Sequence, residues 1–348
     1  MENKSRYFIF GAGICLFTAL LFFSETFASG VSKGLEYCAK LLIPSVFPFI
    51  VAASLAGRGT LPEFLCKILN PVTEFFFGLP AQCAPTIILS LFGGYLSGAK
   101  SVQSLYSSGV IGKKSAERML FFCINAGVGF SVNAVGSGML DSRQAGKVIF
   151  VSLCISSLAN GILSRFFSKN DAITSSAVTP LHTDLASAVT DSVSSGGAAM
   201  LNACTFTVAF SGMCAVFDKY ISDPLLKNAL SCLLEVTKGC SDISGTASLP
   251  VIAAVCAFGG ICVHLQVFSS AKNMEINLPR FYLYRLLNSV TAYVVCKLIL
   301  YLYPVTVPVS VVINPPAAIF SFSAPAAVSL LFLCALLILD LDNSEKIC

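Results

Sequence analysis

Hydrophobic residues occur in long stretches along this chain, and short polar segments separate them. Several stretches approach the roughly 20 residues that a helix needs to cross a bilayer. The clearest are residues 36–57, 147–167, 200–217, 286–303 and 322–340. This pattern predicts an all-α polytopic membrane protein with roughly 8–10 spans or re-entrant segments.

Glycine interrupts two of the hydrophobic stretches, at residues 91–100 and 257–266. The two Phe-Gly-Gly triplets begin at Phe92 and Phe258, 166 positions apart. Glycine weakens a helix because it loses the most backbone entropy on ordering. Irregular backbone at membrane depth is tolerated only where protein buries it or where it lines a cavity. Two broken helices at corresponding places are typical of a transporter binding site.

The same order of segments surrounds both triplets. A hydrophobic span comes first, then an amphipathic stretch (60–79 and 223–238), the glycine-broken segment, a basic loop and a further span. The amphipathic stretches are too polar to span, so we expect each to lie in the interface or to form half of a re-entrant hairpin. We interpret the order as an internal duplication. Inversion of the two repeats needs an odd number of spans in each, which the pattern leaves open.

This interpretation divides the chain into five parts. They are an N-terminal transmembrane helix (1–30), a first repeat (31–168), a polar linker (169–189), a second repeat (190–304) and a C-terminal helix with its tail (305–348). The hydrophobic run at 7–23 follows two basic residues, so it could be a cleaved signal peptide. We favour a retained first helix, because the rest of the chain is embedded in the membrane and needs no separate export signal.

Composition excludes several classes of protein. Of the 348 residues, 55% are hydrophobic and only 11% are charged, against roughly 25% charged in soluble domains. The mean hydropathy is +0.81. The net charge of +4 is ordinary for basic loops, and no soluble basic domain is present to bind nucleic acid. The bilayer is therefore the expected partner, and the oligomeric state is open.

No feature of the sequence indicates an enzyme, a metal site or a cofactor. Most of the 15 cysteines lie in hydrophobic runs, where a free cysteine behaves as a small apolar side chain. No Cys-x-x-Cys pair or cysteine–histidine cluster is present. The chain also lacks a Walker motif for nucleotide hydrolysis and a Gly-x-Ser-x-Gly nucleophile elbow.

Eight residues in or near the irregular segments are candidates for solute binding. A carboxylate at bilayer depth is costly and usually has a partner or a role, and exposed helix N-termini attract anions. The candidates are Ser97, Gly98, Lys100, Asn125, Glu235, Thr237, His264 and Gln266.

Each ionisable candidate also has a plain structural interpretation. Lys100 could extend to the lipid headgroups, and His264 could be a neutral packing residue. Glu235 could carry a coupling proton, coordinate a cation, or pair with Lys238 three residues on. Asn125 could tie helices together instead of contacting a solute. For Arg118 and Arg285, which begin spans after the two basic loops, we favour anchoring at the interface.

Five motifs follow one another along the chain. They are Pro-Ser-Val-Phe-Pro-Phe at 44–49, Gly-Tyr-Leu-Ser-Gly-Ala-Lys at 94–100, Asn-Ala-Gly at 125–127, Leu-Glu-Val-Thr-Lys-Gly at 234–239, and Phe-Gly-Gly at 258–260 running to His-Leu-Gln. In this order they resemble the YlbJ family of sporulation integral membrane proteins, within the nucleoside-recognition Gate superfamily. The resemblance extends over roughly residues 30 to 300. Proline is expected in that family where Leu96 and Val128 stand, so the resemblance is to a divergent member.

The resemblance implies a secondary transporter that moves a small organic anion, dipicolinic acid, across the outer forespore membrane of a bacterial cell. For this flat dianion we hypothesise that Ser97, Gly98 and Lys100 face one carboxylate. His264 and Gln266 would face the other. One alternative is a transporter of nucleosides or another small solute, which predicts acidic and amide contacts instead of basic ones. Another is a sporulation membrane assembly protein without transport. The coupling ion and the orientation are open.

Overall fold

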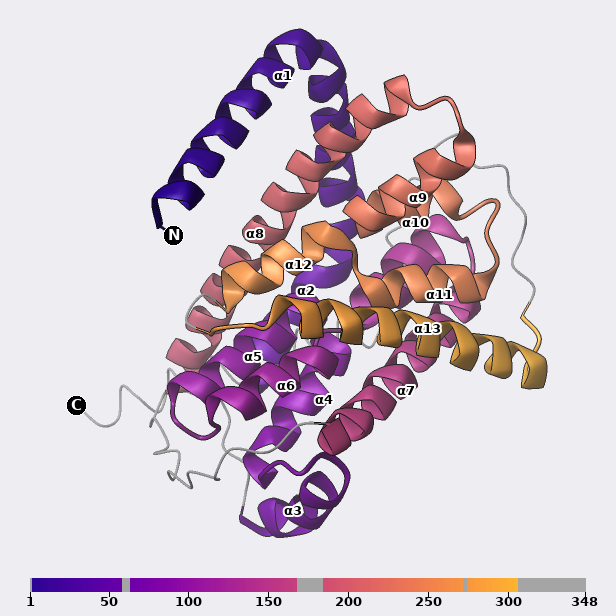
Figure 1. The fold of residues 1–348 in the computed structure, drawn as a ribbon. Coiled ribbons are helices and arrows are strands. Elements are labelled where there is room, and N and C mark those ends of the chain that lie inside the picture. The colour runs from indigo at the N-terminus through magenta and orange to yellow at the C-terminus, as the bar shows by residue number, and fades with distance from the viewer. Residues whose placement is uncertain (1, 58–62, 168–183, 272–273, 306–348) are drawn as a thin grey trace.

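The computed structural model describes residues 2–57, 63–167, 184–271 and 274–305, and this part of the chain is helical throughout (Figure 1). Five helices are long and apolar enough to cross a membrane: Leu20–Ala56, Arg143–Phe167, Leu185–Tyr220, Leu249–Ser270 and Leu278–Leu302. A sixth span results if Lys67–Phe77 and Ala81–Gly93, bent by 86°, count as one. The predicted polytopic membrane fold is confirmed. The predicted span at 322–340 lies outside the described residues.

The described part of the first half contains seven α-helices and three helical segments of other types. The α-helices are α1 (Glu2–Tyr37), α2 (Ile43–Ala56), α3 (Glu63–Phe77), α4 (Ala84–Gly93), α5 (Tyr95–Ser107), α6 (Lys113–Phe122) and α7 (Arg143–Phe167). π-Helical turns occupy Cys38–Leu42 and Gly129–Met139, and a 3-10 turn occupies Ala81–Cys83.

The described part of the second half contains six α-helices. They are α8 (Leu185–Tyr220), α9 (Pro224–Leu234), α10 (Val236–Ile243), α11 (Leu249–Phe258), α12 (Gly260–Ser270) and α13 (Leu278–Leu302). The amphipathic stretch predicted at 223–238 therefore folds as two helices with a break at Glu235.

The N-terminal part of the chain differs from the prediction of two separate spans at 7–23 and 36–57. The structure joins them in one helical path, with a kink at Phe23 (φ −119°, ψ 21°). In Figure 1 the first arm of α1 stands apart from the bundle, and the chain then turns back beside α8. The helix continues through the π-helical turn into α2, which has a proline at its start and Pro48 inside.

Both predicted glycine breaks are confirmed. Gly94 separates α4 from α5 with φ +93°, and Gly259 separates α11 from α12 with φ +88°. Positive φ is accessible to glycine at little steric cost, so these residues can end a helix inside a bundle. The internal duplication itself stays a prediction.

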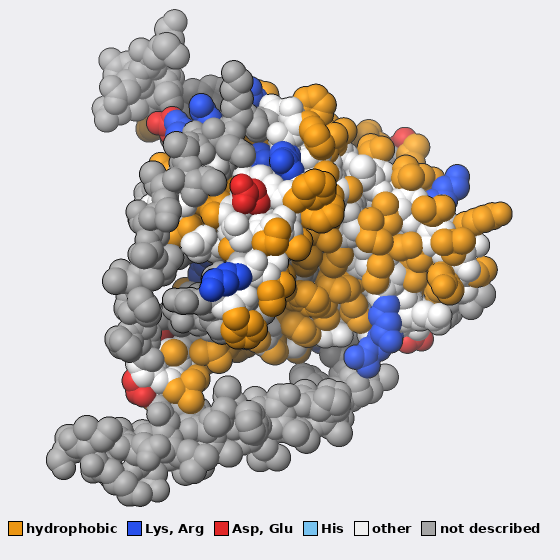
Figure 2. Space-filling model, turned by 90° about the horizontal axis from the view of Figure 1, so that it is seen from below, with side chains coloured by type: hydrophobic (Ala, Val, Ile, Leu, Met, Phe, Trp, Pro, Cys, Tyr) orange, Lys and Arg blue, Asp and Glu red, His pale blue; other side chains and the backbone are white. Residues whose placement is uncertain are grey.

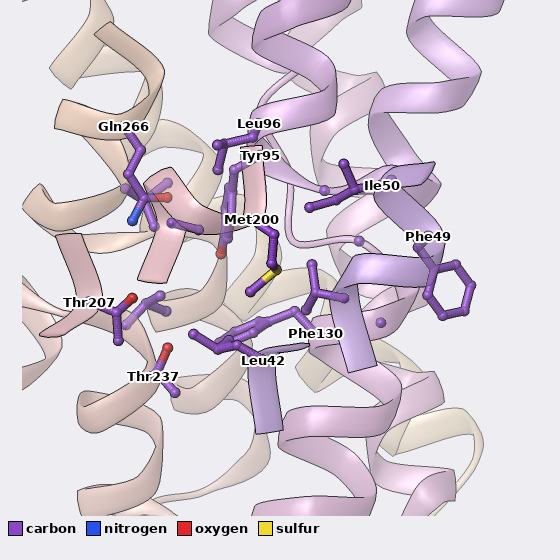
Figure 3. Close-up of a pocket in the computed structure, with 18 of the residues that line it drawn as sticks. Leu42, Phe49, Ile50, Tyr95, Leu96, Phe130, Met200, Thr207, Thr237 and Gln266 are labelled. Carbon is purple, nitrogen blue, oxygen red and sulfur yellow. The ribbon is translucent and has the colours of Figure 1, made fainter. Parts of the chain in front are cut away.

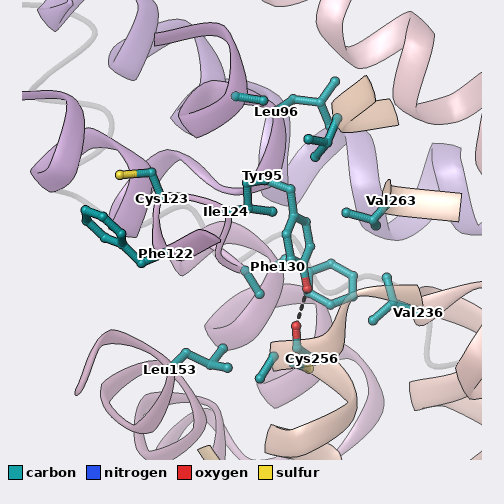
Figure 4. Close-up of a cluster of buried hydrophobic side chains, with 14 of the residues drawn as sticks. Tyr95, Leu96, Phe122, Cys123, Ile124, Phe130, Leu153, Val236, Cys256 and Val263 are labelled. Carbon is teal, nitrogen blue, oxygen red and sulfur yellow. Dashed lines mark hydrogen bonds between the residues drawn. The ribbon is translucent and has the colours of Figure 1, made fainter. Parts of the chain in front are cut away.

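The two broken helices meet in the middle of the bundle. Helix α5 packs against α12, α2 packs against α8, and α11 packs against α7 and α13. The hydroxyl of Tyr95, at the start of α5, donates a hydrogen bond of 2.6 Å to the Cys256 carbonyl near the end of α11 (Figure 4). Hydrophobic side chains cover much of the outer face seen in Figure 2, as a lipid-facing surface requires.

Candidate functional site

A pocket lies where three irregular backbone segments converge: the Gly94 break, the Glu235 break and the segment around Gly127 and Gly129. Its volume is about 60 Å³. One enclosed water needs roughly 10–15 Å³, so several waters or a small solute fit. The pocket is lined by Leu42, Val46, Phe49, Ile50, Gly93, Gly94, Tyr95, Leu96, Gly127, Gly129, Phe130, Met200, Ala203, Thr207, Glu235, Val236, Thr237, Val263 and Gln266.

The labelled polar side chains of the lining gather on one side of this pocket. In Figure 3, Thr207, Thr237 and Gln266 lie together on one side. They come from α8, α10 and α12. The opposite side, from the first half of the chain, presents mainly apolar and aromatic surface that includes the rings of Tyr95 and Phe130. A solute with a flat apolar body and polar edges fits this arrangement.

Glu235 is the one charged side chain among the described lining residues. It occupies the break between α9 and α10 in an extended conformation and is 1% exposed. One carboxylate oxygen accepts a hydrogen bond of 3.1 Å from the Thr237 backbone N–H, and the other accepts one of 2.6 Å from the Lys238 backbone N–H. The side chain therefore caps α10 with a negative charge at the positive end of that helix.

The pairing that we considered between the Glu235 and Lys238 side chains is wrong. The Lys238 ammonium lies 2.8 Å from an Asp218 carboxylate oxygen and contacts the Asp242 carboxylate. It also donates a hydrogen bond of 3.1 Å to the Ser231 hydroxyl. Glu235 therefore accepts a hydrogen bond from the Lys238 backbone N–H, but it makes no contact with the Lys238 ammonium.

The start of α5 is the second electrostatic feature of the pocket. Gly94, Tyr95 and Leu96 line the pocket, and no side chain caps this helix start. The first N–H groups of a helix have no partner within it and carry partial positive charge. Ser97 cannot supply the cap, because its hydroxyl donates back to the Gly94 carbonyl at 2.9 Å.

All four candidates from the first half, Ser97, Gly98, Lys100 and Asn125, lie outside the pocket lining. Lys100 is partly buried, and its ammonium donates a hydrogen bond of 3.2 Å to the Ser195 carbonyl of α8. Gly98 serves a close approach, since a Cβ there would lie 1.8 Å from the Cys123 carbonyl oxygen. Asn125 is fully buried, and neither polar atom of its amide has a hydrogen-bond partner among the described residues.

His264 also lies outside the lining and packs as a core residue. Its ring nitrogen Nε2 is 2.8 Å from the Phe258 carbonyl, so the donor tautomer carries the proton on Nε2. Three rings, those of Phe258, Phe281 and Tyr282, contact it edge to face. Of the eight candidates, the structure brings Glu235, Thr237 and Gln266 together in one pocket.

The preferred interpretation of Arg118 and Arg285 as interface anchors is wrong, because both are buried, at 1% and 0% exposure. The Arg285 guanidinium donates to the Ile124 carbonyl at 2.6 Å and the Phe258 carbonyl at 3.2 Å, and it also donates to the Ala257 carbonyl. Arg285 therefore satisfies carbonyls at the end of α11 and links them to the segment after α6 by hydrogen bonds. Arg118 makes one such bond, of 3.3 Å, to the Gly78 carbonyl after α3.

Sequence reasoning missed several lining residues. Thr207 and Met200 lie on α8, a long helix in which no break marks the positions that face the pocket. Tyr95 had a usable signal, since it is an aromatic residue directly after a glycine break. Within the described residues, no group of three or more histidine, cysteine, aspartate or glutamate side chains could hold a metal ion.

Comparison with known proteins finds one informative relative. No family model matches the chain, and no solved structure matches it. The chain is 22% identical over 312 residues to the sporulation integral membrane protein YlbJ of Bacillus subtilis (strain 168), and the match covers 76% of each protein. The chain is similar to YlbJ over most of its length. The resemblance inferred from the ordered motifs is thereby confirmed, and with the apolar helices it identifies an integral membrane protein.

Proposed function

We propose that this protein is a secondary transporter that binds a small organic solute in the pocket around Glu235. The observation that carries the proposal is the convergence of three helix breaks on one pocket inside a membrane bundle. A buried carboxylate, an amide and two hydroxyls at that depth are costly unless they have a function. Discontinuous helices at a central site are the common construction of solute-binding sites in transporters.

Dipicolinic acid, moved across the outer forespore membrane, is the substrate that we propose first. The relative YlbJ is by its name a sporulation protein. The uncapped start of α5 offers N–H groups to one carboxylate of the substrate. The rings of Tyr95 and Phe130 offer apolar faces to its flat ring, and the Gln266 amide can donate to the other carboxylate.

This geometry revises the hypothesis about which residues contact the substrate. Lys100 and His264 lie outside the lining. The backbone N–H groups of Tyr95 and Leu96 replace Lys100 in the revised hypothesis, and Gln266 retains its assigned role. Substrate carboxylates would then be recognised by helix N-termini and an amide, without a basic side chain.

A nucleoside or another neutral polar solute is the second candidate. The observation in its favour is the absence of lysine and arginine from the described lining, which contains Glu235, Gln266, Thr207 and Thr237 instead. Acidic, amide and hydroxyl groups suit the hydroxyls and base edges of a nucleoside.

The experiment that decides between these proposals measures dipicolinate in spores and mother cells of a deletion strain. Low spore content with accumulation in the mother cell supports transport of dipicolinate. Normal spore content and normal assembly remove this substrate, and nucleoside uptake is then measured. Full dipicolinate content with defective spore assembly indicates an assembly protein instead.

Purified protein in proteoliposomes then tests the pocket. Gln266→Ala should lower the initial rate of labelled dipicolinate uptake, because it removes a polar group of the lining. Lys100→Ala is the matched control, since Lys100 lies outside the lining. If the Gln266→Ala variant and the wild type take up dipicolinate equally at equal expression, this pocket is not the substrate-binding site.

A further inference from the structure

The surroundings of Glu235 contain more negative than positive charge. Lys238 is the nearest cationic side chain on its own helix, and its ammonium is held by the carboxylates of Asp218 and Asp242. Asp218 and Asp242 hold this ammonium between them and Glu235 makes no contact with it, so two negative charges remain unbalanced if all three carboxylates are ionised. Burying an uncompensated charge costs several kcal/mol, so the low-energy state of such a cluster binds a cation.

Within the part of the chain that the structure describes, no lysine or arginine on another element forms an ion pair with Glu235. The remaining titratable groups near Glu235 are hydroxyls and thiols: Tyr37 on α1, Cys38 after it, Tyr95 on α5, Cys214 on α8, and Cys240 and Cys262 on α10 and α12. Phenol and thiol groups are neutral near pH 7 in their ordinary state.

Exposure indicates which of the three carboxylates takes up the proton. The side chains of Asp218 and Asp242 are 29% and 25% exposed and contact the ammonium directly. Glu235 is 1% exposed and has no ammonium contact. Desolvation disfavours the ionised form most strongly at the most buried group. We propose that Glu235 is a proton-binding site and that its proton moves together with the solute.

The structure provides for both protonation states of this side chain. The two backbone N–H bonds and the positive end of α10 stabilise the ionised form when water fills the pocket. When the pocket closes around a solute, loss of that water favours the protonated form. Glu235 would take the proton from the compartment from which the solute enters and release it to water on the other side.

This inference deepens the proposed function and rests on it for the coupling, although proton binding itself does not depend on the solute. A dianionic solute would be repelled by an ionised Glu235 in the same small pocket. A protonated Glu235 removes the repulsion and offers an O–H donor to the solute carboxylate. Proton binding therefore reconciles an acidic lining with an anionic substrate.

The first test uses the full-length protein in sodium-free proteoliposomes with the membrane potential clamped. A pH gradient, acidic on the loading side, should raise the initial rate of labelled dipicolinate uptake several-fold. Glu235→Gln should lose this stimulation, because its side chain cannot take up the proton. Glu275→Gln is the matched control, because that side chain is 87% exposed and contacts Lys113 on the surface.

Two results would overturn the coupling role of Glu235. One is gradient stimulation of the same size in Glu235→Gln and the control. The other is uptake driven by a sodium gradient with no response to pH, which would assign a metal cation in place of the proton. Glu235→Asp keeps a carboxyl group, so it should retain part of the stimulation that Glu235→Gln loses.

The second test needs no solute and therefore separates failure of this inference from failure of the proposed function. Infrared difference spectra of the detergent-solubilised protein, recorded across a pH titration, should contain the carbonyl band of a protonated carboxyl in the wild type and in Glu275→Gln. The band should be missing from Glu235→Gln. If the band is present in all three proteins, Glu235 is not the proton site. If Glu235 titrates but the protein transports neither dipicolinate nor uridine, the transport proposal is overturned and the proton site remains.

Discussion

The two Phe-Gly-Gly breaks have the same sequence but opposite surroundings. At the first break, Gly94, Tyr95 and Leu96 line the pocket, and no side chain caps the start of α5. At the second, side chains bind the free carbonyls at the end of α11: Tyr95 binds Cys256, and Arg285 binds Ala257 and Phe258. The start of α12 has no side-chain cap either, so the breaks differ in position: Gly93 and Gly94 line the pocket, whereas Gly259 and Gly260 do not. A repeated motif therefore fixes where the backbone breaks, but the tertiary neighbours decide what the break binds.

Replacing the two buried arginines should give the largest difference between the halves. Arg285→Met removes a donor from three carbonyls. The Phe258 carbonyl keeps its bond to His264, whereas the Ile124 and Ala257 carbonyls lose their side-chain donor, and each unsatisfied buried acceptor costs about 1–3 kcal/mol. We expect a loss of about 2 kcal/mol or more in the free energy of unfolding. Arg118→Met removes one bond and should cost about 1 kcal/mol. Unfolding by sodium dodecyl sulfate in mixed micelles measures both, and equal losses would contradict the comparison.

The glycines of the two breaks should respond differently to substitution. Gly94 has φ +93° and ψ −177°, a region that is essentially restricted to glycine, so Gly94→Ala should cost about 1–3 kcal/mol. Gly259 has φ +88° and ψ −13°, near the left-handed region that asparagine tolerates. Gly259→Asn should therefore cost less than about 1 kcal/mol. The melting temperatures of the two purified variants test this order, and a larger drop for Gly259→Asn would reverse it.

The hydrogen bond between the two breaks should have a moderate effect. Tyr95→Phe keeps the ring in the pocket wall and removes only the bond to the Cys256 carbonyl. One such bond contributes about 1 kcal/mol, so we expect a loss of that size in the free energy of unfolding. Tyr301→Phe, at a side chain that is 83% exposed, is the control and should change little. A Tyr95→Phe variant as stable as this control would show that the bond does not hold the breaks together.

The smallest effect should come from Lys100, which the hypothesis drawn from the sequence placed against one carboxylate of the substrate. Lys100→Ala loses a bond to the Ser195 carbonyl outside the pocket, so dipicolinate affinity should change by less than about twofold. Gln266→Ala should weaken binding about tenfold, equivalent to about 1.4 kcal/mol. Equilibrium binding of dipicolinate in detergent compares the two variants. A stronger effect at Lys100 would restore the original assignment.

The sequence was informative where local backbone chemistry decides the structure. Glycine in an otherwise hydrophobic helix predicted both breaks, and the rarity of a carboxylate at membrane depth identified Glu235. The amphipathic pattern at 223–238 gave no sign that Glu235 itself marks a third break. That break depends on the carboxylate capping α10, which competes with continuation of the helix.

Other features depend on contacts between distant segments and could not be predicted. His264 follows a glycine break as Lys100 does, but its surroundings come from rings on α13. Arg285 follows a basic loop and resembles an interface anchor in sequence. Its burial follows from three carbonyls that the folded backbone brings together. A hydropathy pattern cannot identify three carbonyls that surround a guanidinium, because every residue has a backbone carbonyl.

The Tyr95 side chain links the contents of the pocket to the distant half of the chain. Its ring forms part of the wall, and its hydroxyl holds a carbonyl 161 positions further along the sequence. A solute that displaces the ring must also stretch or break that bond. Tyr95 is thus a direct mechanical connection between the pocket wall and α11.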